Sequence, residues 1–256
     1  MRRVRIIPVL LIDEGRAIKT TRFRSPVYLG DPMNIVRIFN HKEVDELIVL
    51  DIGATRRRKC PDFALAESLA SECFMPLSFG GGICNLTHAE RLFALGVDKV
   101  CINSAIEGNY ELLGEIAALY GSQAVVASVD TKRSWLGGYS VLTRSGRKRV
   151  AQAPGEVAKS VELAGAGEIL LNSIDHDGCR DGYDLELIRS IADVVSVPVV
   201  ACGGASSIED FRAAVADGGA SAAAAGSFFV LAGRTRAVLI SYPSQAELER
   251  EVFAKL

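Results

Sequence analysis

The sequence has few of the residues that build metal sites and disulfide frameworks. It contains three histidines and six cysteines among 256 residues, and no C-x-x-C pair. The cysteines are scattered singly along the chain, at Cys60, Cys73, Cys84, Cys101, Cys179 and Cys202. This scatter predicts neither a zinc site nor a disulfide framework, and reduced thiols are typical of a cytoplasmic protein. We expect no metal ion, and no motif indicates a cofactor.

The sequence also lacks an excess of charge and a long apolar segment. Its 29 basic and 31 acidic residues give a formal net charge of -2, so there is no electrostatic reason to expect nucleic acid as a partner. The longest uncharged stretch, between Asp217 and Arg234, is too short and too rich in small residues to span a membrane. The apolar segment Ile6–Ile12 follows a basic start, as in a signal peptide. Because Asp13 follows without a small-residue cleavage site, we interpret the segment as a buried strand.

What the chain does have is a repeating pattern of short apolar runs and longer amphipathic segments, typical of βα units that build a parallel sheet. Eight segments are expected to be strands: Arg5–Leu11, Glu46–Asp51, Met75–Phe79, Lys99–Ile102, Ala124–Asp130, Glu168–Asn172, Val197–Ala201 and Ala220–Ala224. Helical periodicity falls between them, for example at Ala64–Cys73, Thr87–Leu95, Tyr110–Tyr120, Glu156–Ala164, Leu185–Ala192 and Ile208–Asp217. The pattern predicts an α/β protein with a single (β/α)8 barrel domain, and 256 residues is the usual size of that fold.

A weak internal repeat divides the predicted barrel into two halves. A shift of 122 positions aligns Gly81-Gly82 with Gly203-Gly204. We expect half-barrels at approximately residues 1–121 and 122–243, followed by a C-terminal helix at residues 244–256. Because half of a barrel leaves strand edges unpaired, the two halves are expected to close into one ring.

The pattern is interrupted after the fifth predicted strand. The segment Lys132–Val150 contains Gly137-Gly138 ahead of the β-prone residues 139–143, which predicts an inserted β-hairpin. We expect Trp135, the single tryptophan of the chain, to pack within this hairpin.

Each predicted half carries glycines at a strand end and a small polar turn about one βα unit later. These residues are Gly81, Gly82, Asn103 and Ser104 in the first half, and Gly203, Gly204, Gly226 and Ser227 in the second. Glycine lets the backbone approach a phosphate, and the start of a short helix offers N–H groups to it. The pattern predicts two phosphate sites and an elongated substrate with a phosphate at each end. The alternative is that the glycines only permit tight turns.

Several stretches, in order from residue 5 to about residue 230, share the pattern of one known family. They are Arg5–Ile7, Gly30–Pro32, Asp45–Leu47, Gly80–Ile83, Gly121–Val126, Gly165–Leu171 and Ser173–Asp175. Together they resemble the cyclase subunit of imidazole glycerol phosphate synthase. The resemblance implies a barrel that works with a glutaminase, a class I glutamine amidotransferase. In this family the glutaminase makes ammonia, which passes through the barrel core to a phosphorylated substrate at the carboxyl ends of the strands.

The resemblance also implies an ammonia gate at the bottom of the barrel. The family's ring of ion-paired residues corresponds here to Arg5, Glu46, Lys99 and Glu168, and Asp98 matches a position that contacts the glutaminase. Four charges at strand starts are costly to bury unless they satisfy one another. The alternative is a network that serves only stability, since the bottom face of a barrel generally serves stability.

The catalytic face departs from the family at one position. The family uses two aspartates as acid and base, and Asp130 matches the second of them, whereas Leu11 stands at the place of the first. Leucine cannot transfer a proton, and losing a general acid or base costs about 10²–10⁴-fold in rate. Asp13 could replace it from the loop that follows the first strand.

Other pocket positions are partly retained and partly changed. Those that keep the family's identities are Lys19, Asp51, Asn103, Asp177 and Gly178. Those where the usual cyclase has a small hydroxyl side chain are Cys101, Asn172 and Cys202. We expect substrate contacts from Lys19, Asp51, Asn172, Asp177 and Cys202, and a phosphate contact from Gly178. The alternative for the two cysteines is a role as small apolar fillers.

These changes favour a different substrate, and three stretches look like a divergent branch of the family. They are Pro32–Asn34, Cys202–Ala205 and Arg236–Pro243. That branch implies acetamidino-sugar formation in surface-polysaccharide biosynthesis, with an amidotransferase as a further partner and a phosphorylated or nucleotide-linked substrate. One alternative is the genuine cyclase of histidine biosynthesis. Another is a non-catalytic subunit that activates a glutaminase.

Two further loops are expected on the catalytic face. The basic run Arg56–Lys59 would steer an anionic substrate, or be an ordinary solvated loop. His176 would transfer protons, although its place in Asp175–Gly178 favours a turn residue.

Overall fold

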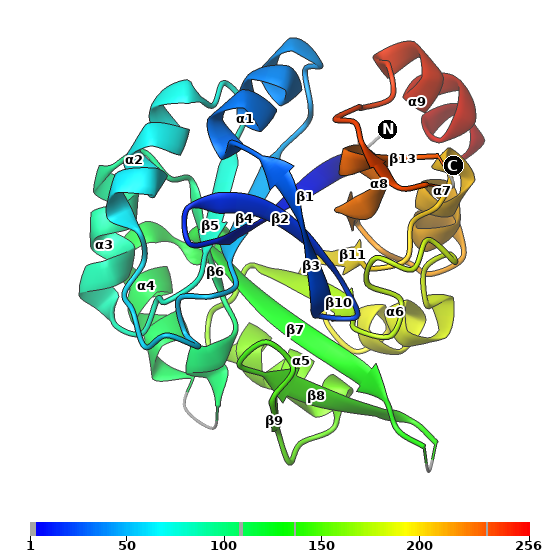
Figure 1. Cartoon of the computed structure of the whole chain (residues 1–256). Coiled ribbons are helices and arrows are strands. Elements are labelled where there is room, and N and C mark those ends of the chain that lie inside the picture. Colours follow the sequence, from blue (N-terminus) through cyan, green and yellow to red (C-terminus); the bar gives the residue numbers. More distant parts are fainter. Residues whose placement is uncertain (1–3, 108–109, 136, 234) are drawn as a thin grey trace.

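The computed structural model describes residues 4–107, 110–135, 137–233 and 235–256. In this part of the chain, eight parallel strands close into a barrel (Figure 1). In chain order they are β1 (Arg5–Asp13), β4 (Leu47–Asp51), β5 (Leu77–Gly80), β6 (Lys99–Ile102), β7 (Val125–Arg133), β10 (Glu168–Ser173), β11 (Val199–Cys202) and β12 (Ala222–Ala225). β12 pairs with β1 and closes the ring, so the predicted (β/α)8 barrel is confirmed.

Helices surround the barrel and follow its strands (Figure 1). They are α1 (Pro32–His41), α2 (Phe63–Glu72), α3 (Leu86–Ala94), α4 (Glu111–Tyr120), α5 (Pro154–Leu163), α6 (Leu185–Ala192), α7 (Ile208–Ala216), α8 (Ser227–Val230) and α9 (Gln245–Glu251). Short 3₁₀ helices cover Ser104–Ile106, Ser122–Ala124 and Phe253–Lys255. Local caps fix several helix starts. Asp31, for example, accepts hydrogen bonds from the N–H groups of Met33 and Asn34 at the start of α1.

Two apolar cores result from the alternation of side chains along the strands. In β10, Ile169 and Leu171 point outward into the large core beneath the helices, whereas Leu170 points into the barrel. The inner core is smaller, and its buried members are Ile7, Val9, Leu11, Ile18, Ile48, Cys101, Val126, Leu170, Val200, Ala222 and Ala224. The barrel interior between its two ends is therefore almost entirely apolar.

The strand boundaries differ from the prediction by up to three residues. β5, β11 and β12 each begin two residues later than expected, because the apolar residues Met75, Val197 and Ala220 pack before their strand without joining its ladder. β1 runs to Asp13, since it continues into an antiparallel pair in which Asp13 lies opposite Arg16. The expectation that Asp13 lies in a loop is therefore wrong.

Two strand additions extend the mouth of the barrel. A hairpin of β2 (Arg16–Thr21) and β3 (Arg24–Gly30) follows β1 and was not predicted. β7 continues past the barrel and pairs with β8 (Tyr139–Thr143), which pairs with β9 (Lys148–Arg149). The predicted insertion is thus confirmed in part, although its first arm is the barrel strand itself. A short ladder also joins β13 (Leu231–Ala232) to β14 (Ala237–Val238).

The tip of the β7–β8 arm corrects one expectation. Trp135 is 93% exposed, so it does not pack within the hairpin. Of the expected C-terminal helix at 244–256, residues 245–251 form α9 and the 3₁₀ turn follows. The division into two half-barrels stays a prediction. Among the described residues, we find no helix with the length and apolar character that a membrane crossing needs.

Candidate active site at the carboxyl ends of the strands

A cavity of 190 Å³ opens at the carboxyl ends of the barrel strands. The sequence-predicted residues that line it are Leu11, Asp13, Lys19, Asp51, Gly81, Gly82, Cys101, Asn103, Ser104, Asp130, Asn172, Asp177, Cys202 and Gly226. The strands bring these residues together from both halves of the chain, because parallel strands end at the same rim of a barrel. The structure therefore groups the predicted catalytic and substrate-contacting residues in one place.

Asp130 is the buried carboxyl group of this cavity that is suited to proton transfer. Burial raises its pKa to about 7, and the charge of Asp177 acts in the same direction. Two amides oppose the rise by donating hydrogen bonds to the carboxylate: Asn172 Nδ2 at 3.4 Å and Asn103 Nδ2 at 3.2 Å. A carboxyl group with a pKa near neutrality exchanges protons readily at physiological pH.

Leu11 faces the same cavity without any group that could complement Asp130. It is 8% exposed and belongs to the inner core. Asp13 lies two residues further along β1 and also lines the cavity, but it forms ion pairs with Arg57 and, at 2.9 Å, with Arg56. Burial alone would raise the pKa of Asp13, yet the two guanidinium groups lower it overall. Asp13 is therefore a carboxylate paired with two arginines, and it is poorly suited to proton transfer.

Lys19 and Asp177 form a buried ion pair at one side of the site. Lys19 Nζ lies 2.6 Å from Asp177 Oδ1, and Thr20 Oγ1 donates to Asp177 Oδ2 at 3.2 Å. Lys19 comes from β2 and Asp177 from the turn after β10, so the pair joins the unpredicted hairpin to the barrel. This contact closes one wall of the cavity.

A smaller second hollow adjoins this ion pair. Its predicted phosphate-binding residues are Gly178, Gly203, Gly204, Gly226 and Ser227. Ser227 Oγ is buried and has no hydrogen-bond partner among the described residues. Arg180 also lines the hollow. A buried unpaired hydroxyl beside a guanidinium group suits a phosphate oxygen, since an unsatisfied polar group is otherwise costly.

The glycines have a structural role of their own. A Cβ atom on Gly204 would lie 1.9 Å from the carbonyl oxygen of Gly182, and one on Gly81 would lie 2.3 Å from that of Asp51. Both glycines also have positive φ angles, of 118° and 113°. The tight-turn alternative therefore accounts for these residues with or without a phosphate.

In the first predicted phosphate site, Asn103 is already engaged. Besides Asp130, its Nδ2 donates to the carbonyl oxygen of Ser128 at 2.9 Å. Gly81, Gly82 and Ser104 line the cavity beside it. The side-chain amide of Asn103 is therefore used by Ser128 and Asp130, so Ser104 and the backbone N–H groups are the groups of this site that remain for a phosphate.

The changed pocket positions are an amide and two thiols. Asn172 Oδ1 is buried and unpaired within the described part of the chain, although its Nδ2 binds Asp130. Burial raises the pKa of the Cys202 thiol to about 12 and also raises that of Cys101, so both are neutral thiols. Burial likewise raises the pKa of Asp51, whose Oδ1 accepts backbone hydrogen bonds in the following turn.

The opposite end of the barrel carries the predicted ring of charges. Arg5 pairs with both Glu46 and Glu168, and Lys99 Nζ lies 2.8 Å from Glu46 and 3.0 Å from Glu168. Ser78 Oγ donates to Glu46 at 3.0 Å. Burial would raise the pKa of Glu168, but Arg5 and Lys99 lower it overall. All four charges are thus mutually satisfied.

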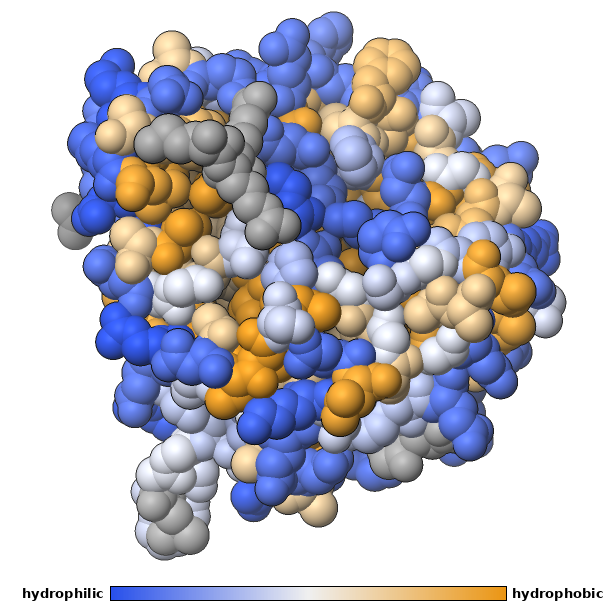
Figure 2. All heavy atoms as spheres, turned by 180° about the vertical axis from the view of Figure 1, so that it is seen from behind, coloured by the Kyte–Doolittle hydropathy of each residue, from blue (hydrophilic) through white to orange (hydrophobic). Residues whose placement is uncertain are grey.

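The surface around this ring is mixed in character (Figure 2), with apolar patches between polar side chains. Two large apolar side chains are exposed just before barrel strands. Phe74 lies between α2 and β5, and Leu163 is the last residue of α5, before β10. Asp98 is exposed, and its Oδ2 accepts a hydrogen bond from the N–H of Leu77 at 2.8 Å. The structure places Asp98 on the predicted partner face, and its role there stays a prediction.

Sequence reasoning missed the outer wall of the active-site cavity. Phe23, Ser145 and Arg147 line it from the β2–β3 turn and the β8–β9 loop. Ser145 and Arg147 belong to the predicted insertion, but no motif indicated that this insertion reaches the cavity, and Phe23 belongs to the hairpin that was not predicted. Arg56 also lines the cavity, paired with Asp13, and His176 lies in a turn with Nδ1 2.9 Å from Asp181. The described residues contain no cluster of side chains suited to holding a metal ion.

Comparison with known proteins places the chain among close relatives. A family model described as "Histidine biosynthesis protein" matches residues 5–234. A Pseudomonas aeruginosa protein provisionally named imidazole glycerol phosphate synthase subunit hisF2 is 49% identical over 97% of this chain and 99% of its own length. A provisionally named HisF subunit of Leptospira interrogans is 44% identical, over 97% and 98%. The imidazole glycerol phosphate synthase subunit HisF of Alkaliphilus metalliredigens is 40% identical, over 88% and 89%.

Proposed function

The chain belongs to the histidine biosynthesis protein family, among the HisF-like cyclase subunits of imidazole glycerol phosphate synthase, and from this membership we propose that it forms carbon–nitrogen bonds with ammonia. The ammonia comes from a glutaminase of the class I glutamine amidotransferase type, docked at the strand starts. The acceptor is an elongated substrate with phosphates at both ends. The names of the relatives favour the histidine-pathway reaction.

One observation carries the proposal: a charged ring, an apolar interior and an ionisable carboxyl group follow one another along the barrel. Arg5, Glu46, Lys99 and Glu168 stand at the entrance, and Asp130 stands at the exit. Neutral ammonia crosses an apolar interior at little cost, whereas ammonium or a hydrated ion does not. The sequence of these three layers supports a route that admits ammonia and excludes ions.

Asp130 is the proposed acid–base residue. Its pKa of about 7 lets it take a proton from the attacking nitrogen and return it to a leaving group. Ser104, Ser227 and the glycine turns are proposed to bind the two phosphates. Lys19 and Asp177 are proposed to hold the substrate between them, together with Asp51, Asn172 and Cys202.

Leu11 favours a second candidate, the formation of an acetamidino group on a sugar. The histidine-pathway reaction of this family uses a carboxyl group at this position, and Asp13 is held by two arginines. A reaction that adds ammonia without ring closure would need fewer proton transfers. This candidate adds an amidotransferase partner and a nucleotide-linked substrate, and the names of the relatives give it no support.

Complementation of a bacterial strain that lacks its cyclase subunit, and so requires histidine, separates the candidates. The proposed histidine reaction predicts growth with the wild-type gene and no growth with Asp130→Asn. No growth with wild type but growth with Leu11→Asp would show a retained site that lacks one acid–base group, and would favour the sugar candidate. If the protein only activates a glutaminase, the Asp130→Asn variant should form as much product as the wild type.

A further inference from the structure

A third cavity lies beside the barrel mouth, between the β2–β3 turn and the β8–β9 loop. Its volume is 440 Å³, against 190 Å³ for the candidate active site. In Figure 1 the β2–β3 turn reaches toward β7, which forms a further side of this cavity. A hollow of this size falls within the range of small-ligand pockets, roughly 300–1,000 Å³.

The charge of the cavity lining is strongly positive. Arg22, Arg24, Lys132 and Arg147 contribute four cations, and Asp175 contributes one anion. The protein as a whole has a formal net charge of -2. The cavity is therefore a local concentration of positive charge on a chain with no overall excess of it, and such a concentration attracts anions.

None of these four cations forms an ion pair with a described residue. Arg22 Nε donates to the carbonyl oxygen of Asp175 at 2.9 Å. In contrast, the side chains of Arg24, Lys132 and Arg147 form no hydrogen bond or ion pair with any described residue. Like charges held at one cavity repel one another, and a bound polyanion would relieve this repulsion.

The two turns that frame the cavity are held in unusual backbone conformations. Arg22 and Phe23 in the β2–β3 turn, Ser25 just after it in β3, and Arg144 and Ser145 in the β8–β9 loop have φ angles between 50° and 60°, although none is glycine. Such conformations cost free energy and concentrate at ligand sites. The turns are also tied to their surroundings, since Ser145 Oγ donates to the carbonyl oxygen of Ile52 at 3.1 Å. The cavity is therefore built into the fold.

We propose that this cavity binds a diphosphate group beside the candidate active site, with which it shares Phe23, Ser145 and Arg147. Arg24, Lys132 and Arg147 donate to the phosphate oxygens, because guanidinium and ammonium groups form strong charge-assisted hydrogen bonds with them. Phe23 and Ile174 provide an apolar side that suits the remainder of a ligand. The diphosphate belongs either to a nucleotide or to a free inorganic ligand.

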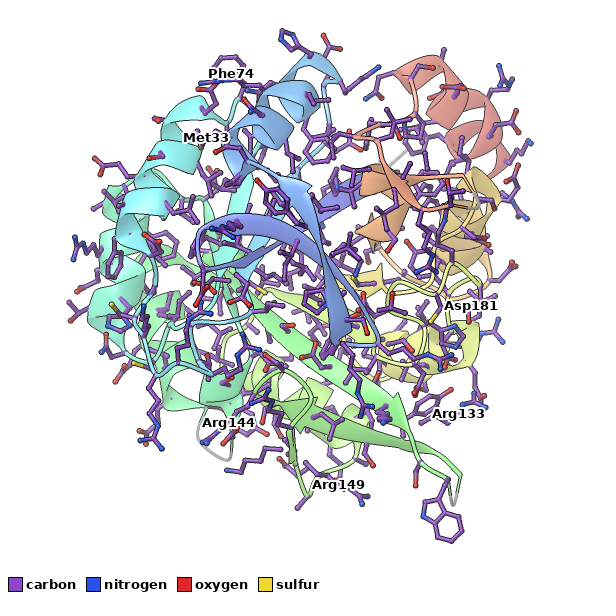
Figure 3. The ribbon with its side chains drawn as sticks, in the orientation of Figure 1. Met33, Phe74, Arg133, Arg144, Arg149 and Asp181 are labelled. Carbon is purple, nitrogen blue, oxygen red and sulfur yellow. The ribbon has the colours of Figure 1, made fainter. Side chains whose placement is uncertain are left out.

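Isothermal titration of the whole protein with inorganic pyrophosphate and with ADP tests the site without reference to catalysis. Arg24 and Lys132 line this cavity and not the candidate active site, so the test variant is Arg24→Gln with Lys132→Gln. Arg149→Gln is the matched control, because Arg149 is an exposed cation on the outer strand β9, away from the β2–β3 turn (Figure 3). Thermal unfolding of each variant checks that the fold is kept.

The proposal predicts that the double variant binds pyrophosphate at least about tenfold more weakly, while the control changes by less than about twofold. Tighter binding of ADP than of pyrophosphate, abolished by Phe23→Ala, would identify a nucleotide. Equal affinities unaffected by Phe23→Ala would identify a free diphosphate. Wild-type affinity in the double variant, or equal weakening in Arg149→Gln, would overturn the site.

Discussion

The two ends of the barrel differ in whether their buried polar groups have hydrogen-bond or ion-pair partners. At the strand starts, four charges and the Ser78 hydroxyl satisfy one another. At the strand ends, Asn172 Oδ1 and Ser227 Oγ are buried without partners among the described residues, and Asp130 lies in surroundings that favour its neutral form. A satisfied network is complete within the chain, whereas buried polar groups without partners are suited to binding a ligand. The contrast distinguishes a self-contained charged ring at the strand starts from a candidate active site at the strand ends.

The largest predicted effect is at the reaction site. Asp130→Asn should lower ammonia-dependent turnover by about 10²–10⁴-fold, because the amide cannot exchange a proton. The free energy of unfolding should not fall, since the variant removes a costly buried carboxylate. Steady-state kinetics and urea unfolding measure the two effects. Asp13→Asn is the control, because that carboxylate is already neutralised by Arg56 and Arg57. Equal losses of turnover in Asp130→Asn and Asp13→Asn would contradict a special role for Asp130.

The next effect is at the ring. Glu46 is 2% exposed and binds both Arg5 and Lys99. Glu46→Ala should lower the free energy of unfolding by about 3 kcal/mol, because it leaves two partly buried cations short of a partner. Glu72→Ala, which removes an exposed pair with Arg37, should cost less than about 1 kcal/mol. Urea unfolding compares them, and similar losses would argue against a coupled ring.

The pH dependence of stability gives a smaller contrast. The pKa of Asp130 is about 7 in the folded protein, whereas the ordinary pKa of an aspartate is 3.8, so the folded state binds the extra proton between these values. Stability should therefore fall as pH rises from about 4 to about 7, relative to Asp130→Asn. Urea unfolding of both proteins across this range measures the difference. A wild-type protein that gains stability over the variant in this window would contradict the raised pKa.

The smallest effect concerns single hydroxyl groups. Without a ligand, Ser227→Ala should stabilise the protein by about 1 kcal/mol, because the variant removes an unsatisfied buried polar atom. Ser78→Ala should destabilise it by a similar amount, since that hydroxyl binds Glu46. Thermal unfolding shows the sign of each change, and inorganic phosphate should stabilise the wild type more than Ser227→Ala. Changes of the same sign would remove the distinction between the two ends.

The barrel was predictable because its strands alternate with helices at regular intervals, and each strand carries a short apolar run. The β2–β3 hairpin was not, since only two residues of Arg16–Thr21 are apolar, yet four consecutive residues are buried. Ala17 and Ile18 join the apolar cores, and Lys19 pairs with Asp177, a contact across more than half of the chain. Such burial depends on tertiary structure, which local patterns do not encode.

The candidate site was predictable where a residue type itself carries the chemistry. The ring residues and Asp130 were named from resemblance, and the structure brings each group together. Other features depend on distances between elements and were not predictable. Asn103 donates to Asp130, Asn172 Oδ1 has no partner among the described residues, and Arg147 forms part of the cavity wall. The sequence likewise did not indicate that Asp13 pairs with Arg56 and Arg57, which makes it unsuited to act as a substitute acid.

The most direct test of the account is the fate of nitrogen supplied as 15N-labelled ammonium chloride to the purified protein with the ribulosyl substrate of the histidine pathway. The proposed histidine-pathway reaction predicts a product in which NMR detects one 15N atom in the new ring, and no such product from Asp130→Asn. Unlabelled substrate recovered unchanged from the wild-type protein, under conditions where titration shows that the substrate binds, would contradict it.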